Sequence, residues 1–257
     1  MGNLFLSSEA GVIAILGIPT LLYLAAAHRR PPGPIEQLSE TIANYNLFNS
    51  LYSIFLGLAL VTLMVNFNTV QDDTRKEAED IISATRLING LSEGKPLTEK
   101  LIAYAKAVVE FDLPAMGRGE MSPQASTAFD ALWNQAYAIS LTSKKEESIH
   151  SLMLGDLSDI TKCRLTRRMK AKENLHPMIF FLIVFGYYVM LVKTYLTRVG
   201  SRKTQLAFEL PMFAMVILVI TTIIDLNTPF VGIVNIDTTA FRWALERATA
   251  IAATPRP

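Results

Sequence analysis

Four long stretches without a charged residue restrict the fold of this chain more than any other feature. They cover residues 10–27, 41–71, 178–192 and 210–224. A helix needs about 20 residues to cross the roughly 30 Å hydrocarbon core of a bilayer. The first two stretches meet this length directly, and the last two meet it if their flanking charges lie at the interface or face protein. The sequence therefore predicts an integral membrane protein with four spans.

The composition agrees with a membrane protein and excludes several other classes. Of the 257 residues, 51% are hydrophobic, and 24 basic side chains nearly balance 23 acidic ones. This charge balance leaves no basic excess for nucleic acid, so we expect no nucleic-acid partner. The single cysteine, Cys163, excludes an internal disulfide or a thiolate metal cluster. It has no neighbouring histidine of the kind that activates a nucleophilic cysteine.

The first stretch is compatible with a membrane span and with a signal peptide cleaved near the sequence AAAH. Its N-terminal part has no Lys or Arg and contains Glu9. Because signal peptides begin with a positively charged region, this pattern favours the span.

The spans form two pairs, with about a hundred residues between them. We expect the first transmembrane pair in 1–70, a helical extramembrane domain in 71–175, the second pair in 176–226 and a C-terminal segment in 227–257. In the middle region Ile81, Ile82 and Ile88 recur at helical spacing, so the second span is expected to continue beyond the membrane. The predicted fold class is all-α, with four transmembrane helices and a helical domain between the second and third.

Positive charges near the spans favour a cytosolic middle domain. Loops rich in Lys and Arg stay on the cytoplasmic side. On the side of the middle domain the basic residues are Arg75, Lys76, Arg86, Lys162, Arg164, Arg167, Arg168, Lys170 and Lys172. On the opposite side they are Arg29, Arg30, Arg198, Arg202 and Lys203. This orientation places both termini inside.

The sequence contains no enzyme signature. It has no glycine-rich phosphate loop, no nucleophile elbow and no metal-binding helix. Its three histidines, His28, His150 and His176, are far apart and have no partner at ligand spacing. We therefore expect no catalytic residue, no metal and no cofactor.

The second span carries an unusual number of small and polar side chains. They are Asn46, Asn49, Ser50, Ser53, Gly57, Thr62, Asn66 and Asn68. Such residues allow close packing of membrane helices. They are equally compatible with a pore lining, in which apolar rings from several subunits form a constriction. The residue pattern leaves both interpretations open.

Two acidic residues, Glu209 and Asp225, border the fourth stretch. An ionisable group at membrane depth is costly unless it is paired or solvated, so such groups are functional candidates. The alternative is that both mark the headgroup level at the ends of a short helix.

Four motifs occur in order along the chain: GLALVTLMVNFNTVQDDTRKEAEDI, LIAYAKAVVEFDLPAM, RLTRRMKAKENLHP and DLNTPFVGIVNI. Together, over about residues 50–246, they resemble the bacterial bestrophin-like membrane proteins. That family is similar to bestrophins, which are pentameric anion channels with four membrane helices per subunit and a cytosolic helical region between the second and third. The resemblance implies the same plan for this chain.

The resemblance also implies a pore neck on the second span. Bestrophins line their neck with apolar residues one helical turn apart, beside a Ser and a Gly, and SLYSIFLGL is similar. The resemblance thereby assigns Ser50, Ile54 and Leu58 to the constriction, with Ser53 and Gly57 alongside. This neck is more aliphatic than the Phe-rich version, which leaves the selectivity among monovalent ions open.

The stretch after the fourth span resembles the acidic residue and Pro-Phe-Gly turn of bestrophins. The matching residues are Asp225, Pro229, Phe230 and Gly232, with Val231 inserted before the glycine. We expect an elbow in which Pro229 stops the helix and Gly232 permits the reversal.

Calcium-gated animal bestrophins follow this turn with a run of acidic residues, whereas here only Asp237 follows. One carboxylate cannot supply the six to eight oxygens that calcium prefers. Calcium gating by that route is therefore not expected.

Two functions are compatible with these observations. The first is a homo-oligomeric, pentameric ion channel, anionic or non-selective, in the lipid bilayer. The second is a non-conducting membrane scaffold or accessory subunit of a larger membrane complex. In the channel, the basic run before the third span would raise the local anion concentration or lie against anionic lipid headgroups.

Overall fold

A computed structural model of the chain describes residues 11, 13–27, 38–172, 175–196 and 202–254. Every regular element within these ranges is a helix, so the all-α fold class is confirmed for the described residues. They fall into two compact units, one within 1–65 and 175–227 and the other within 66–174 and 228–257.

Several residues on which the span, orientation and histidine predictions depend lie outside the described part of the chain. They are Glu9, His28, Arg29, Arg30 and Arg198, together with the side chains of Lys172, Arg202 and Lys203. The orientation in the membrane therefore stays a prediction.

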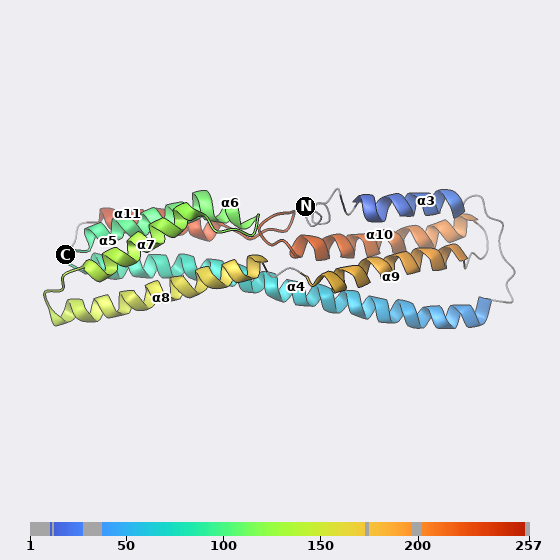
Figure 1. Cartoon of the computed structure of the whole chain (residues 1–257), viewed down its shortest axis with the longest axis horizontal. Coiled ribbons are helices and arrows are strands. Elements are labelled where there is room, and N and C mark those ends of the chain that lie inside the picture. Colours follow the sequence, from blue (N-terminus) through green and yellow to red (C-terminus); the bar gives the residue numbers. More distant parts are fainter. Residues whose placement is uncertain (1–10, 12, 28–37, 173–174, 197–201, 255–257) are drawn as a thin grey trace. The chain divides into compact units, whose positions relative to one another are not determined.

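The first unit contains the apolar helices. A short π-helix, η1 (Ile13–Gly17), leads into α3 (Ile18–Ala27). The N-terminal part of α4 (Leu38–Asn89), α9 (Pro177–Leu196) and α10 (Arg202–Leu226) complete it (Figure 1). Stretches of α4, α9 and α10 are long and apolar enough to cross a membrane, whereas the apolar helix at 14–26 is shorter. Three of the four expected spans thus have a matching helix, and the count of four stays a prediction.

Tyrosine hydroxyl groups connect the helices of the first unit. The hydroxyl of Tyr52 donates to the Ile183 carbonyl at 2.7 Å, and that of Tyr23 donates to Glu209 at 2.8 Å. Tyr187 contacts Thr20 through its hydroxyl group. In hydrocarbon there is no water to satisfy these polar groups, so pairing across helices fixes their positions. Glu209, one of the two acidic residues that border the fourth stretch, is buried and paired in this way.

The 52-residue helix α4 belongs to both units. Its charge-free part runs to Gln71, and from Asp72 it continues with charged residues and buries Ala78, Ile81 and Ile88 in the second unit. The expected continuation of the second span as a helix is confirmed.

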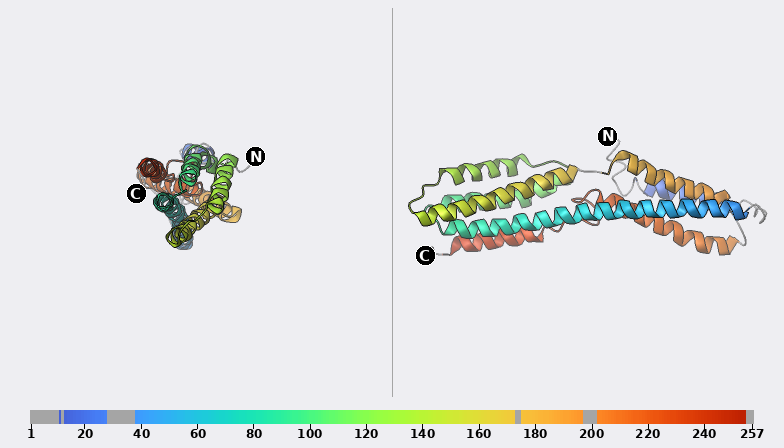
Figure 2. Two further views of the ribbon diagram at one scale, coloured as in Figure 1. Left: turned by 90° about the vertical axis from the view of Figure 1, so that its left-hand side faces the viewer. Right: turned by 90° about the horizontal axis from the view of Figure 1, so that it is seen from below.

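The second unit is a helical bundle that includes the C-terminal part of α4, and its helices run roughly along one direction in Figure 2. Its other elements are α5 (Lys95–Ala107), η3 (Val108–Asp112), α6 (Leu113–Met116), α7 (Pro123–Ala138), α8 (Lys144–Lys172) and α11 (Thr239–Ala253). Its core draws on all the longer helices, for example through Leu101, Leu132, Met153 and Phe241. The C-terminal segment therefore contributes α11 to this core.

Ser122 begins α7 as the N-cap, where its hydroxyl oxygen accepts from the backbone N–H of Ala125 at 3.4 Å. Pro123 follows at the first helical position. Such a cap satisfies one of the backbone donors left free at a helix start.

Candidate functional site

The residues expected at the pore neck lie on one exposed face of α4. Ile54 is 60% exposed and Leu58 is 64% exposed. Ser50, Ser53 and Gly57 are exposed beside them. Because these positions recur at three and four residues, they form a single stripe along the helix. Further along this stripe the exposed residues are Leu47, Leu51, Val61, Met64 and Val65.

The opposite face of α4 makes the packing contacts within the chain. Tyr52, Leu56, Ala59 and Leu63 are all buried there. Helix α9 approaches this face closely, because a Cβ atom on Gly186 would collide with the ring of Tyr52. The close helix contact of the first unit is therefore made by a glycine of α9, on the other side of α4 from the small residues of the stripe.

The small residues of the exposed stripe do not serve packing within one chain. A Cβ atom added at Gly57 would meet no atom within 4 Å. The hydroxyl of Thr62 donates to the Leu58 carbonyl of its own helix at 2.9 Å. Polar groups within membrane segments mostly face a bundle interior or a water-filled path. This stripe is thus suited to face other copies of the chain or an aqueous path.

Helix α10 ends at Leu226, three residues before Pro229. Pro229 is buried, and Phe230 packs against the hydrophobic core of the second unit. Gly232 has φ 121°, a conformation that side-chain-bearing residues rarely adopt. The N–H of Ile236 donates to the Pro229 carbonyl at 2.9 Å and closes the loop. Asp225 lies half-buried in the last turn of α10, and its role stays a prediction.

Asp237 holds the start of α11. Its carboxylate accepts from the Thr239 backbone N–H at 2.9 Å and from the Thr239 hydroxyl at 2.8 Å. These hydrogen bonds lower the pKa of Asp237. Among the described residues no group of three or more His, Cys, Asp or Glu side chains could hold a metal ion.

Cys163 is buried in α8, and burial raises the pKa of its thiol to about 11. The thiol is therefore protonated at neutral pH and unsuited to act as a nucleophile.

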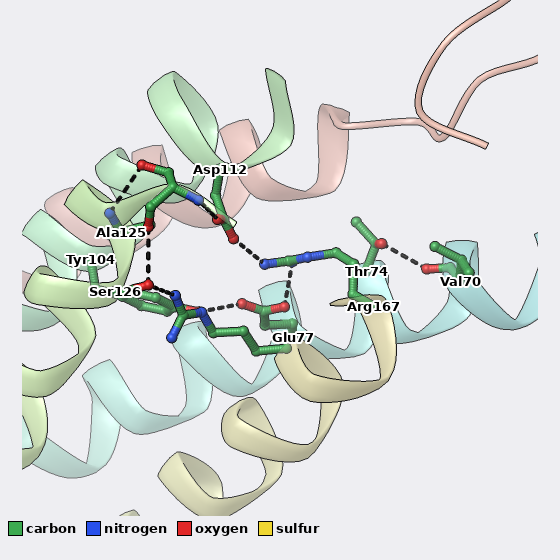
Figure 3. Close-up of polar contacts among 10 residues, drawn as sticks. Val70, Thr74, Glu77, Tyr104, Asp112, Ala125, Ser126 and Arg167 are labelled. Carbon is green, nitrogen blue, oxygen red and sulfur yellow. Dashed lines mark hydrogen bonds and ion pairs between the residues drawn. The ribbon is translucent and has the colours of Figure 1, made fainter. Parts of the chain in front are cut away.

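The second unit contains a buried ionic centre that the sequence did not predict. Arg167, expected among the basic residues near the membrane, lies in this centre. The guanidinium of Arg167 is fully buried and donates to Glu77 at 2.5 Å and to Asp112 at 3.0 Å. The hydroxyl of Tyr104 donates to the second oxygen of Glu77 at 2.5 Å. These side chains come from α4, α5, η3 and α8 and point toward one another in Figure 3. The centre therefore joins most of the bundle at one point.

Neighbouring contacts extend the centre to the start of α7. The second oxygen of Asp112 accepts from the backbone N–H of Ser122 at 2.9 Å. Arg164 donates to the Ser126 hydroxyl at 2.9 Å, and its guanidinium carbon lies 5.0 Å from the centroid of the Phe129 ring. Aromatic faces stabilise such partly desolvated cations.

Both carboxylates of the centre accept from the Arg167 guanidinium, and Arg164 adds a second positive charge nearby. Burial raises the pKa of Glu77, and the positive charge of Arg167 opposes this rise. Burial and the charge of Glu77 also raise the pKa of Tyr104, which keeps its hydroxyl protonated as a donor. One pattern in the sequence points to a buried Glu77. Thr74 and Ile81 lie three and four residues from it on the same helical face, and both are buried.

The sequence profile of the bestrophin-like domain matches residues 14–241. The chain belongs to the bestrophin-like family. The match extends from η1 to the start of α11 and includes the α4 stripe, the ionic centre and the turn after α10. The bestrophin-like resemblance stated from the sequence motifs is thereby confirmed. A search of curated proteins and a search of solved structures found no match to this bestrophin-like chain.

Proposed function

We propose that this bestrophin-like protein is the subunit of a homo-oligomeric, pentameric ion channel in the bacterial inner membrane. The observation that carries the proposal is the exposed α4 stripe, because a membrane helix packed on one side leaves small, polar and apolar residues free on the other. Several copies that turn this stripe toward a common axis would line a continuous path.

Ile54 and Leu58 form the constriction in this proposal. Their branched side chains are one helical turn apart, so a ring of subunits would present two adjacent apolar layers. A narrow apolar layer excludes water and ions until it widens. Ser50, Ser53 and Gly57 lie between and beside these layers and narrow the path less. The aliphatic lining favours neither anions nor cations, so the proposed channel is anionic or non-selective.

The remaining parts have supporting roles in the proposal. The first unit supplies four membrane spans, and the second unit forms a cytosolic vestibule. Asp225 acts in assembly or gating and not in permeation, since it lies at the end of α10 and off the α4 stripe. Calcium gating through an acidic run is not part of the proposal, because the turn after α10 is followed by a single carboxylate, Asp237, which accepts from Thr239 at the start of α11.

Substitution of Gly57 tests the pore assignment. In Gly57→Leu the new side chain enters open space within one subunit, so folding and assembly should persist. In a ring, however, the same side chains would crowd the axis. We expect single-channel current in planar bilayers to be abolished, while the oligomer elutes from size-exclusion chromatography as the wild type does.

Gly155→Leu is the matched control, because a Cβ atom at this exposed position of α8 also meets nothing within 4 Å. It should leave the current unchanged. Unaltered current in Gly57→Leu, or no current from the wild-type protein, would contradict the channel. A monomer, or a fixed complex with a different protein, would favour the scaffold.

A further inference from the structure

The C-terminal end of α8 carries apolar and basic side chains that no part of the described chain covers. Leu165 is 50% exposed and Met169 is 70% exposed, and the two are one helical turn apart on one face. Arg168 is exposed beside Met169. Exposed apolar side chains next to a cation suit a segment at the membrane interface, where the apolar groups reach the acyl chains and the cation stays at the headgroups.

The contact between Lys170 and α4 sets the depth of this surface. The Lys170 ammonium lies 3.4 Å from the side-chain oxygen of Asn66. Asn66 directly follows Val65, the last residue of the exposed apolar stripe. The exposed apolar side chains of α4 extend from Leu47 to Val65, about 27 Å along the helix, which is close to the roughly 30 Å thickness of the hydrocarbon and places Asn66 at its edge. The last turns of α8 therefore lie at the level of the lipid headgroups.

The structure also reduces the basic run of this region to a small exposed set. Arg164 and Arg167 are buried in the ionic centre. Lys162 pairs with Asp159 at 2.7 Å. Among the described side chains at this end of α8, Arg168 is therefore the exposed cation, with Lys170 half-buried behind it. A single exposed guanidinium can bind the phosphate of a phospholipid, because the two charges are opposite in sign. The apolar side chains on either side of it can contact the acyl chains.

We propose that Leu165, Arg168 and Met169 form a docking surface for the anionic phospholipid headgroup layer. The two apolar side chains insert between headgroups, and the guanidinium binds lipid phosphate. The proposal depends on the membrane position of α4 and not on ion conduction, so it is independent of the channel.

Spin labels test the depth of the surface. Met169→Cys and Leu152→Cys are each labelled in the full chain, reconstituted in vesicles of phosphatidylglycerol and phosphatidylcholine. The native Cys163 is buried and does not compete for label. Leu152 is 63% exposed on the same helix, about 25 Å toward its other end. We expect the label at 169 to collide with oxygen more than with a water-soluble nickel chelate, and the label at 152 to show the reverse. A water-accessible label at 169 would refute lipid docking, and shielding from both reagents would show a protein contact, such as a second copy.

Lipid retention tests the charge. In Arg168→Gln the amount of phosphatidylglycerol that remains on the purified protein, relative to phosphatidylcholine, should fall about fivefold, the equivalent of one basic residue near an anionic surface. Lys145→Gln makes the same charge change at the exposed start of α8 and should leave the ratio unchanged. Equal ratios in the two variants would exclude a role for Arg168 in lipid binding.

Discussion

The side chain of Arg167 is fully buried, whereas that of Arg168, the next residue of α8, is exposed. The two arginines are indistinguishable by residue type and nearly so by position. Only the packing of α8 against α4 and η3 turns one toward Glu77 and Asp112 and the other toward the surface. At the residue scale, therefore, the same basic run supplies both a structural ion and a surface charge.

Arg167→Met should destabilise the second unit. It leaves Glu77 and Asp112 buried without a cation, and such a change typically costs about 3–5 kcal/mol. We expect a matching loss of hydrogen-exchange protection in peptides from α5 and α8, measured by mass spectrometry on the full chain. Arg168→Met, one residue away on the surface, should change protection by less than about 0.5 kcal/mol. Equal effects of the two substitutions would show that the ionic centre does not stabilise the bundle.

Asp80, in the C-terminal part of α4, gives the second unit a pH dependence. Burial raises its pKa from 3.8 to about 6, and the nearby carboxylates Asp156 and Asp159 add to the rise while Lys76 opposes it. One oxygen each of Asp80 and Asp156 is buried without a hydrogen-bond partner among the described residues. A raised carboxyl pKa means that the folded state holds the proton more tightly than the unfolded state. The stability that this proton provides is present below pH 3.8 and is lost as the pH rises to about 6.

Asp80→Asn should therefore stabilise the protein at pH 7, and its free energy of unfolding should vary less between pH 4 and 6. We expect a gain of about 1 kcal/mol, after allowing for the solvent that screens this half-buried group. Hydrogen exchange of α4 and α8 at pH 5 and pH 7, corrected for intrinsic rates, measures it. Asp72→Asn, on an exposed position of the same helix, is the control and should not change the profile. A profile unaltered by Asp80→Asn would assign the pH dependence elsewhere.

At the scale of elements, α4 has two faces with different tasks. The face with Tyr52 and Leu56 packs within the first unit, and the face with Ile54 and Leu58 is left exposed. Both faces are apolar, so hydrophobicity alone does not separate them. Gly186 of α9 allows the Tyr52 face of α4 to pack against α9, because the ring of Tyr52 occupies the space that a side chain at position 186 would need.

Gly186→Leu should separate α9 from α4. The new side chain has no space beside Tyr52, and overpacking of this kind typically costs about 1–3 kcal/mol. We expect the thermal midpoint of the detergent-solubilised protein to fall by several degrees. Gly57→Leu, the same change in open space on the other side of α4, should leave the midpoint unchanged. If both variants melted like the wild type, the close approach of α9 to α4 would be wrong.

At the scale of the whole molecule, the exposed α4 stripe indicates an assembly. Images of the purified protein by electron microscopy should show a closed ring, expected to be pentameric, with α4 nearest the axis. The double variant Ile54→Ala and Leu58→Ala should keep this ring and conduct severalfold more current, because shorter side chains weaken the apolar barrier. Unchanged current would remove these residues from the constriction, and rings with α4 on the outer surface would refute the pore.

The sequence by itself determined the class of the protein. Long charge-free stretches leave a helical membrane protein as the physically suitable fold, since every backbone group in hydrocarbon must be paired within the chain. The motifs also determined the bestrophin-like family, and the period of Ile81 and Ile88 determined the continuation of α4 as one helix. These are local properties, which depend on residues close together along the chain.

Only the tertiary structure decided which side chains meet. Glu77 and Arg167 are 90 residues apart, and nothing in either segment specifies the other as its partner. Likewise, the stripe with Ser50, Ile54 and Leu58 became a distinct surface only because Tyr52 and Leu56 were buried behind it. Burial depends on contacts between elements that are distant in sequence, and periodicity defines a helical face without stating what that face will contact.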